Sequence, residues 1–182
     1  MAGPAGTGGP ALNLEDAATE RAASLDRALS ERASQIVMGR PTGVFLRLRA
    51  CLEHQASKLK RTEPDRNGLV SICLGPAFDK GPTPEHFLFD SGTRLSFWLM
   101  LHEENGESSL VAYSFRYWLP SGRSPEFLRF DLNRESHPDT LKEPRCHLHP
   151  GLDEVRLPLP VLDPFEVLDR IFFVIEPALL SQ

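Results

Sequence analysis

The segment from Phe127 to Glu154 concentrates the side chains that could transfer protons or bind a metal ion. It contains three of the six histidines, one of the three cysteines and several carboxylates. If residues 145–149 form a strand, Arg145, His147 and His149 share one face, because side chains alternate along a strand. We therefore expect the functional site in this segment.

One interpretation of the segment is metal-free acid–base chemistry. The pKa of histidine is about 6.5, so one imidazole could take a proton while another returns it. The acid–base set would be His137, His147 and His149. Arg129 and Arg145 would clamp phosphate oxygens, with Arg116 as a further candidate and Asp131 orienting an imidazole. Such a site needs no metal and no cofactor, and its reaction would be metal-independent RNA cleavage.

A second interpretation is a metal site. His147, His149 and Glu154 follow an H-x-H-x4-E spacing that is similar to the first motif of cupins, in which such residues bind a divalent metal. The flanking glycines and the second histidine motif of cupins are missing. Cys146 would point to the opposite face of the strand, so we expect a small buried side chain and not a zinc ligand.

A third interpretation is structural, because two of these histidines precede prolines and would simply begin turns beside strands. The spacing leaves this open. The histidines at positions 54, 86 and 102 have no titratable cluster around them, so we expect structural roles for them. Serine-based hydrolysis has no G-x-S-x-G motif to support it, and nucleotide-dependent catalysis lacks a glycine-rich phosphate loop.

Length and composition predict a single soluble domain. The chain has 182 residues, 41% of them hydrophobic and 25% charged, as in ordinary globular proteins. Its apolar runs are far below the roughly 20 residues that span a bilayer, and the N-terminus lacks a secretory signal. We therefore expect a cytoplasmic protein with no membrane contact. The three cysteines are widely spaced, and we expect reduced thiols.

The net charge of −5 disfavours a general nucleic-acid coat, because phosphate neutralisation by Lys and Arg supplies most non-specific affinity. Residues 40–66 are locally basic, with seven Lys or Arg against three acids. They could form a phosphate-facing surface or simply a solvated helix face. Since residues 123–156 are slightly acidic, RNA binding would require the basic segment or a partner.

The organisation that we predict is a disordered tail (1–11), a helical arm (12–39) and a single α+β domain (40–182). The arm should reach Val37 or Met38, with Gly39 and Pro41 ending it. A second helix is expected over residues 43–61, where apolar residues recur near helical spacing.

From residue 69 the pattern becomes strand-like. Alternating segments (LVSICL, HFLFD, TRLSFWLMLH, SLVAYSFRYWL and EFLRFDL) predict an antiparallel meander of five or six strands. Turns at Asp90-Ser91-Gly92 and Asn105-Gly106 should close hairpins. A closing helix begins at Asp163 as N-cap with Pro164 in its first position. We expect N-terminal and C-terminal helices to cover the sheet.

Residues 85–175 resemble the TumE-like toxins of prokaryotic toxin–antitoxin operons. Members show a run close to RYDNAPHHPELPTFPHHKH, and this chain has RFDLNRESHPDTLKEPRCHLHPGLDE, followed by FEVLDRIFFVI for a helix. The matching positions are Arg129, Asp131, His137, Pro138, Pro144, His147 and His149. Ser136 and Cys146 or Leu148 stand where the paired histidines of the family would place an imidazole.

The resemblance implies a growth-inhibiting toxin that is neutralised by a cognate antitoxin protein and has an RNA-directed activity. The alternative is a non-catalytic module that binds protein through its sheet and helical arm. An adjacent reading frame for a DNA-binding antitoxin would favour the toxin, and its absence would favour the interaction module.

Overall fold

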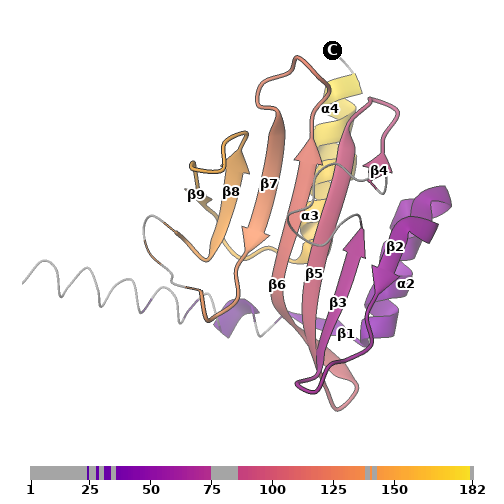
Figure 1. The fold of residues 1–182 in the computed structure, drawn as a ribbon, viewed down its shortest axis with the longest axis vertical. Coiled ribbons are helices and arrows are strands. Elements are labelled where there is room, and N and C mark those ends of the chain that lie inside the picture. Colours follow the sequence, from indigo (N-terminus) through magenta and orange to yellow (C-terminus); the bar gives the residue numbers. More distant parts are fainter. Residues whose placement is uncertain are drawn as a thin grey trace, which may run out of the picture.

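The protein has an α+β fold built on one antiparallel sheet (Figure 1). The computed structural model describes residues 24, 28, 31–33, 36–74, 86–137, 140 and 143–180. Within these residues the sheet has nine strands, ordered β2-β3-β5-β6-β7-β8-β9, with β1 paired to β6 and β4 to β5. The strands are β1 (Val37–Gly39), β2 (Leu59–Arg61), β3 (Leu69–Leu74), β4 (Phe87–Leu88), β5 (Arg94–Glu104), β6 (Glu107–Trp118), β7 (Phe127–Leu132), β8 (Cys146–Pro150) and β9 (Leu157–Pro158).

The centre of the sheet is the long hairpin of β5 and β6. Asn105 and Gly106 connect them with φ values of 53° and 81°, the left-handed pair that two-residue hairpin turns require. The turn around Ser91 joins β4 to β5, with Phe87 opposite Leu95. Both predicted hairpins are therefore confirmed, and sequence neighbours form the middle of the sheet.

Two helical regions lie in the described part of the chain besides short helical stretches near residue 31. The first is α2 (Pro41–Leu52), which continues as a 3-10 helix (Glu53–Lys58). The second is the C-terminal helix, made of α3 (Pro164–Arg170), a π-helical segment (Ile171–Ile175) and α4 (Glu176–Leu180). As predicted, Asp163 caps it, accepting from the Phe165 N–H at 2.7 Å, and Glu166 completes a capping box.

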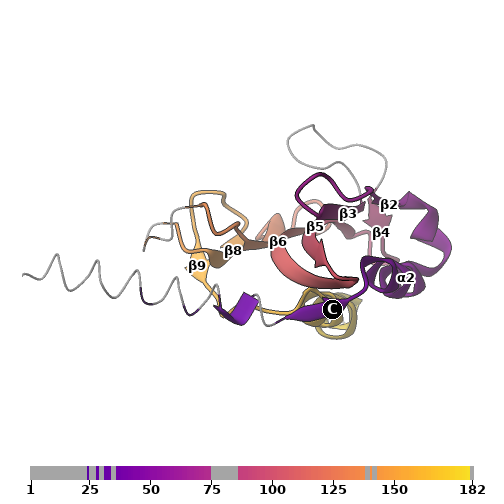
Figure 2. The ribbon, with the colours of Figure 1, turned by 90° about the horizontal axis from the view of Figure 1, so that it is seen from below.

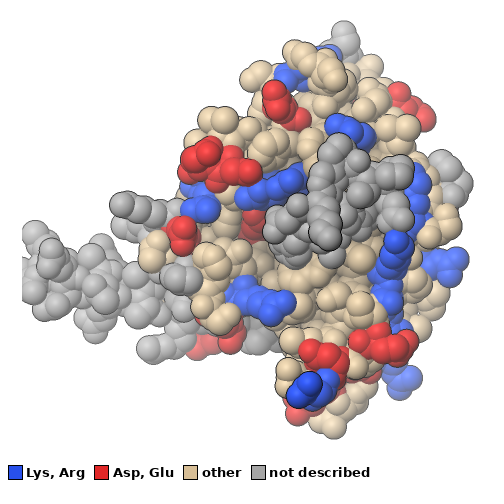
Figure 3. Space-filling model, viewed as in Figure 1, with Lys and Arg blue, Asp and Glu red and all other residues tan. Residues whose placement is uncertain are grey.

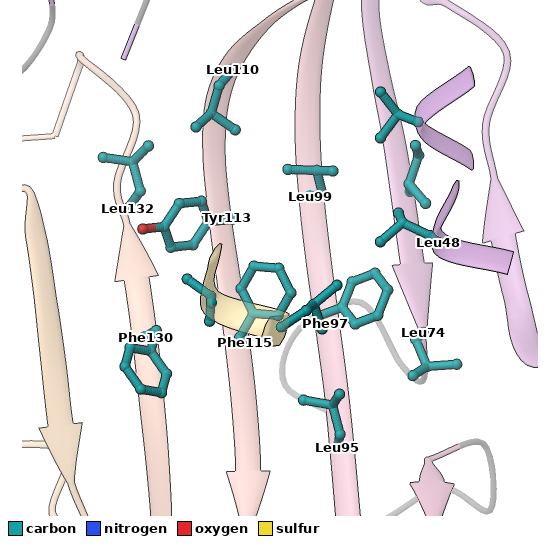
Figure 4. Close-up of a cluster of buried hydrophobic side chains, with 14 of the residues drawn as sticks. Leu48, Leu74, Leu95, Phe97, Leu99, Leu110, Tyr113, Phe115, Phe130 and Leu132 are labelled. Atoms are coloured by element: carbon teal, nitrogen blue, oxygen red, sulfur yellow. The ribbon is translucent and has the colours of Figure 1, made fainter. Parts of the chain in front are cut away.

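The hydrophobic core lies between one face of the sheet and these helices. Leu48 of α2 and Val167 of α3 join the same buried cluster as Phe97, Phe115 and Phe130 from the central strands (Figure 4). Figure 2 shows the C-terminal helix against one face of the sheet. The predicted packing of the aromatic face of β6 on a helix is confirmed, because its aromatic side chains are buried in this cluster. No helix among the described residues is both long and apolar enough to cross a membrane.

The predicted count of five or six strands is too low. The strands that were not predicted, β1, β2 and β9, have only two or three residues each. A period of two cannot be recognised in so short a segment. The predicted helix over 43–61 is also too long, since Leu59–Arg61 pairs with β3 and ends the helical region.

The C-terminal end of the expected helical arm (residues 12–39) is a strand and not a helix. Helix is described at residues 24, 28 and 31–33, but Val37–Gly39 is a strand that pairs with Ser108 and Ser109 of β6. The start of β6 can pair with β1 because β7 pairs only with residues 113–118 of that strand. Pro41 does not end a helix but begins α2, where its missing N–H costs nothing. The predicted tail of residues 1–11 and most of the arm lie outside the described residues.

Candidate functional site

Strands β7 and β8 bring the predicted site residues together. The two strands are antiparallel, with Arg129 opposite His149 and Asp131 opposite His147. Directly paired residues on adjacent strands project from the same face, about 5 Å apart. Four of the six predicted site residues therefore form one group, which we call the HRD cluster: Arg129, Asp131, His147 and His149.

The HRD cluster lies on the face of the sheet opposite the helices. Phe130 and Leu132 of β7 point into the hydrophobic core. Because side chains alternate along a strand, Arg129 and Asp131 point away from it. The alternation in β8 is the same. Cys146 is buried in the core, where its Sγ donates to the Pro160 carbonyl at 3.3 Å. Burial raises the pKa of its thiol to about 11. The prediction that Cys146 is a buried apolar residue is confirmed.

Asp131 is the centre of the cluster. Its Oδ2 atom lies 3.6 Å from His147 Nε2, 3.4 Å from His149 Nε2 and 2.7 Å from Arg129 Nε. Burial would raise the pKa of Asp131, but the contacts with His149 and Arg129 outweigh it and lower the pKa below the ordinary carboxyl value. The carboxylate is therefore ionised at neutral pH. Its other oxygen, Oδ1, is buried without a hydrogen-bond partner among the described residues, although Ser114 lies opposite on β6 and helps to lower the pKa.

The tautomer of His147 is fixed by a backbone carbonyl. Its Nδ1 forms a short hydrogen bond with the carbonyl oxygen of Pro144, and since a carbonyl only accepts, Nδ1 carries the proton. Burial lowers the pKa of His147, against the raising effect of Asp131, so the neutral ring is favoured. Its Nε2 then presents a lone pair to Asp131.

His149 has the same arrangement and is fully buried. Arg129 Nη2 lies 2.7 Å from its Nε2, and because a guanidinium only donates, Nε2 is the acceptor. The proton is therefore on Nδ1, which faces the Leu152 carbonyl at 3.3 Å. Two imidazole lone pairs and one carboxylate oxygen thus face one another, an arrangement that suits a cation.

Arg129 is a cation that contacts two of these three acceptors in the structure. Besides Asp131 and His149, it contacts Asp153 through Nη1 at 2.6 Å. The Arg129 side chain is 15% exposed, whereas that of Asp153 is 62% exposed. Arg129 therefore connects the buried cluster to the surface of the loop after β8.

The described hydrogen bonds of the other two predicted site residues are with the connection between β7 and β8. His137 is exposed in the connection between β7 and β8, where its backbone N–H donates to the Arg134 carbonyl. Arg145 is buried, and its Nε donates to the Asn133 carbonyl at 3.1 Å. These contacts stabilise the connection itself. The expected convergence of all three histidines with Arg145 is not what the described contacts show.

The carboxylate of the cluster is Asp131 and not Glu154, the residue that the cupin-like spacing would use. Among the described residues, the group of ligand atoms within 4.8 Å of one another comes from Asp131, His147 and His149, and Glu154 is exposed. The spacing of residues in the sequence did not predict the ion pair between Arg129 and Asp153, because Asp153 lies in a loop. The one signal was the density of acidic residues after His149.

The basic segment of residues 40–66 lies away from the cluster. Figure 3 shows Lys and Arg along the sheet edge that β2 forms, whereas over β7 and β8 they alternate with Asp and Glu. Strands β3, β5 and β6 separate the two regions, a distance of about 19 Å from β2 to β7 at ~4.8 Å per strand. Lys58 of this segment donates to the His86 carbonyl at 2.7 Å, so part of its charge has a structural role.

The fold and the site define an α+β protein with an open antiparallel sheet whose polar face carries an aspartate, two histidines and an arginine. Comparison with protein-family models, with curated proteins and with solved structures found no match to this chain. The resemblance to TumE-like toxins therefore stays a prediction.

Proposed function

We propose that Asp131, His147 and His149 bind one divalent transition-metal ion. The observation that supports this is the convergence of three acceptor atoms within 4.8 Å, with both imidazole protons held on the far nitrogens by backbone carbonyls. Histidines that ligate metals usually donate their second N–H in this way. Ligand binding also requires neutral imidazoles and an ionised carboxylate. The lowered pKa values of His147 and Asp131 favour these forms.

The donor set favours particular ions and a catalytic type of site. Two imidazoles and one carboxylate suit Zn²⁺, Fe²⁺ or Mn²⁺ and not Ca²⁺ or Mg²⁺, which prefer oxygen ligands. Three protein ligands leave at least one coordination position for water or substrate, as in catalytic zinc sites. A metal there would lower the pKa of bound water and act as a Lewis acid.

The test is calorimetric titration of the protein with Mn²⁺ and with Zn²⁺. We expect one ion per chain, and loss of at least about tenfold in affinity in His147→Ala and Asp131→Asn, since each removes a ligand. His137→Ala is the matched control, because His137 lies outside the cluster, and its affinity should equal that of the wild type. Circular dichroism verifies that each variant is folded. Unchanged affinity in folded His147→Ala would refute the metal site.

The second candidate is the toxin-like, metal-independent ribonuclease predicted from the sequence. It is supported by the pairing of His147 and His149, whose ring centroids are 4.7 Å apart, and by the guanidinium of Arg129 beside them. One ring would take a proton from a ribose hydroxyl while Arg129 holds the phosphate. Expression should then inhibit growth, and a cognate antitoxin protein should relieve the inhibition.

The chelator EDTA separates the two candidates. RNA cleavage by purified protein that persists in EDTA supports the metal-independent enzyme, whereas cleavage that EDTA abolishes and Mn²⁺ restores supports a metal enzyme. Growth inhibition that survives in a folded His147→Ala/His149→Ala variant would contradict the ribonuclease and favour the protein-interaction module.

A further inference from the structure

Arg129 and a metal ion cannot both bind Nε2 of His149 in the HRD cluster. A neutral imidazole has one lone pair, on the nitrogen without hydrogen, and in His149 this lone pair accepts from Arg129 Nη2 at 2.7 Å. The oxygen of Asp131 that faces both histidines is also the one that Arg129 Nε contacts at 2.7 Å. A metal bound by His149 must therefore displace the guanidinium from that nitrogen, and its charge also competes with Arg129 for the same carboxylate oxygen of Asp131.

The structure also provides a place for the displaced guanidinium. Asp153 already accepts from Arg129 Nη1 at 2.6 Å, and it lies outside the group of three ligand residues. Its carboxylate is largely exposed and stays available when Asp131 is bound to metal. Arg129 can thus keep one charged partner while it gives up the other.

We propose that Arg129 is a resident cation that competes with the metal, and that metal binding transfers its guanidinium from Asp131 and His149 to Asp153. This inference rests on the proposed metal site. It makes Arg129 the residue that sets the metal affinity, and it makes Asp153 a positioning residue that acts only through Arg129.

The same displacement defines the class of ligand that the loaded site should take. Arg129 is directly opposite Arg116 on β6, and two like charges at such a position repel each other. When Asp131 is bound to metal, Arg129 loses one of its two carboxylates, so less negative charge compensates this arginine pair. An anionic oxygen ligand beside the metal would restore the balance, and a guanidinium is well suited to bind it. Metal and anion should therefore bind with positive coupling.

The experiment measures the dissociation constant for Mn²⁺ in the wild type, Arg129→Gln, Asp153→Asn and the double variant. We expect Arg129→Gln to bind Mn²⁺ at least about tenfold more tightly and Asp153→Asn to bind it more weakly. The double variant should match Arg129→Gln, because Asp153 has no effect without Arg129. A general effect of charge would instead be additive and return the double variant to the wild-type value.

Arg94→Gln is the matched control, since it removes the same charge from an exposed residue of β5 that stacks on Trp118. Its affinity should stay within a factor of about two of the wild type, as expected for a surface charge. If Arg129→Gln does not fold, Arg129→Lys replaces it: the lysine keeps the charge but cannot span His149 and Asp131, so tighter binding is again expected.

The outcomes separate the two proposals. Equal affinities in the wild type and in Arg129→Gln would overturn the competition and leave the metal site standing. Absence of Mn²⁺ binding in every variant would overturn the metal site itself. The anion is tested with sulfate at constant ionic strength: sulfate should tighten Mn²⁺ binding in the wild type but not in Arg129→Gln. Equal tightening in both would show that Arg129 does not hold the anion.

Discussion

The imidazole rings of His147 and His149 lie with their centroids 4.7 Å apart and their planes at 69°, and a backbone carbonyl fixes each ring through Nδ1. The residues are two apart on β8, so the strand places both rings on one face. The carbonyls belong to Pro144 before the strand and Leu152 after it. The two lone pairs are thus oriented before any ligand arrives.

Metal should stabilise the fold. An ion that binds only the folded chain raises the free energy of unfolding by about 2.7 kcal/mol when its concentration is 100 times the dissociation constant. We expect this rise for Mn²⁺ or Zn²⁺ in urea denaturation of the wild type, and EDTA should reverse it. His147→Ala should show no comparable rise. A stabilisation of the same size in that variant would place the ion elsewhere.

Replacing Gly68 should cost more stability than replacing Gly106. Both glycines have left-handed backbones, with φ of 72° and 81°, so alanine is strained at either, by about 1 kcal/mol. A Cβ at Gly68 would also lie 2.7 Å from the Glu103 carbonyl oxygen, whereas nothing lies within 4 Å at Gly106. We expect Gly68→Ala to lose clearly more free energy of unfolding in urea titrations. Equal losses would contradict the close approach of residue 68 to β5.

The three thiols should differ in reactivity. Cys146 is buried with a thiol pKa raised by burial to about 11, whereas Cys51 is exposed. Burial and Asp169 also raise the pKa of Cys51, but its thiol is accessible, so a thiol reagent at neutral pH should label Cys51 before unfolding and Cys146 only after it. Mass spectrometry of the labelled peptides, with and without denaturant, measures this order. Fast labelling of Cys146 in the native protein would contradict its placement in the core.

Asp65 should contribute to acid sensitivity. Its Oδ1 accepts from the backbone N–H groups of Leu69 and Asn67 at 2.9 and 2.8 Å, and these bonds lower its pKa below the ordinary carboxyl value. A pKa that is lower in the folded state stabilises the fold above the unfolded pKa, and this stabilisation is lost as the pH falls through the folded pKa.

The variant Asp65→Asn tests this contribution, because asparagine keeps an acceptor oxygen but cannot titrate. Between about pH 5 and pH 2, the wild type should lose more free energy of unfolding than the variant does. A carboxyl pKa measured by NMR at or above the ordinary value for aspartate would contradict the two hydrogen bonds.

Much of the fold could be predicted from the residues because the signals are local. The alternation in residues 109–119 placed the aromatic side chains of β6 in the core, and Asn105-Gly106 identified the hairpin turn. The cap at Asp163 also needed only neighbouring residues. The strands that were missed have two or three residues, too few to show an alternating pattern, and it is their pairing with β6, β3 and β8 that makes them strands.

The sequence by itself determined that His147 and His149 share a face, since a period of two fixes the direction of side chains within one strand. Only the tertiary structure decided that Asp131 and Arg129 lie opposite these histidines, while His137 and Arg145 support the connection. Register between β7 and β8 depends on how both strands pack on the core, because the connection between them is too long to impose it as a tight turn would. The cluster is therefore a product of strand pairing.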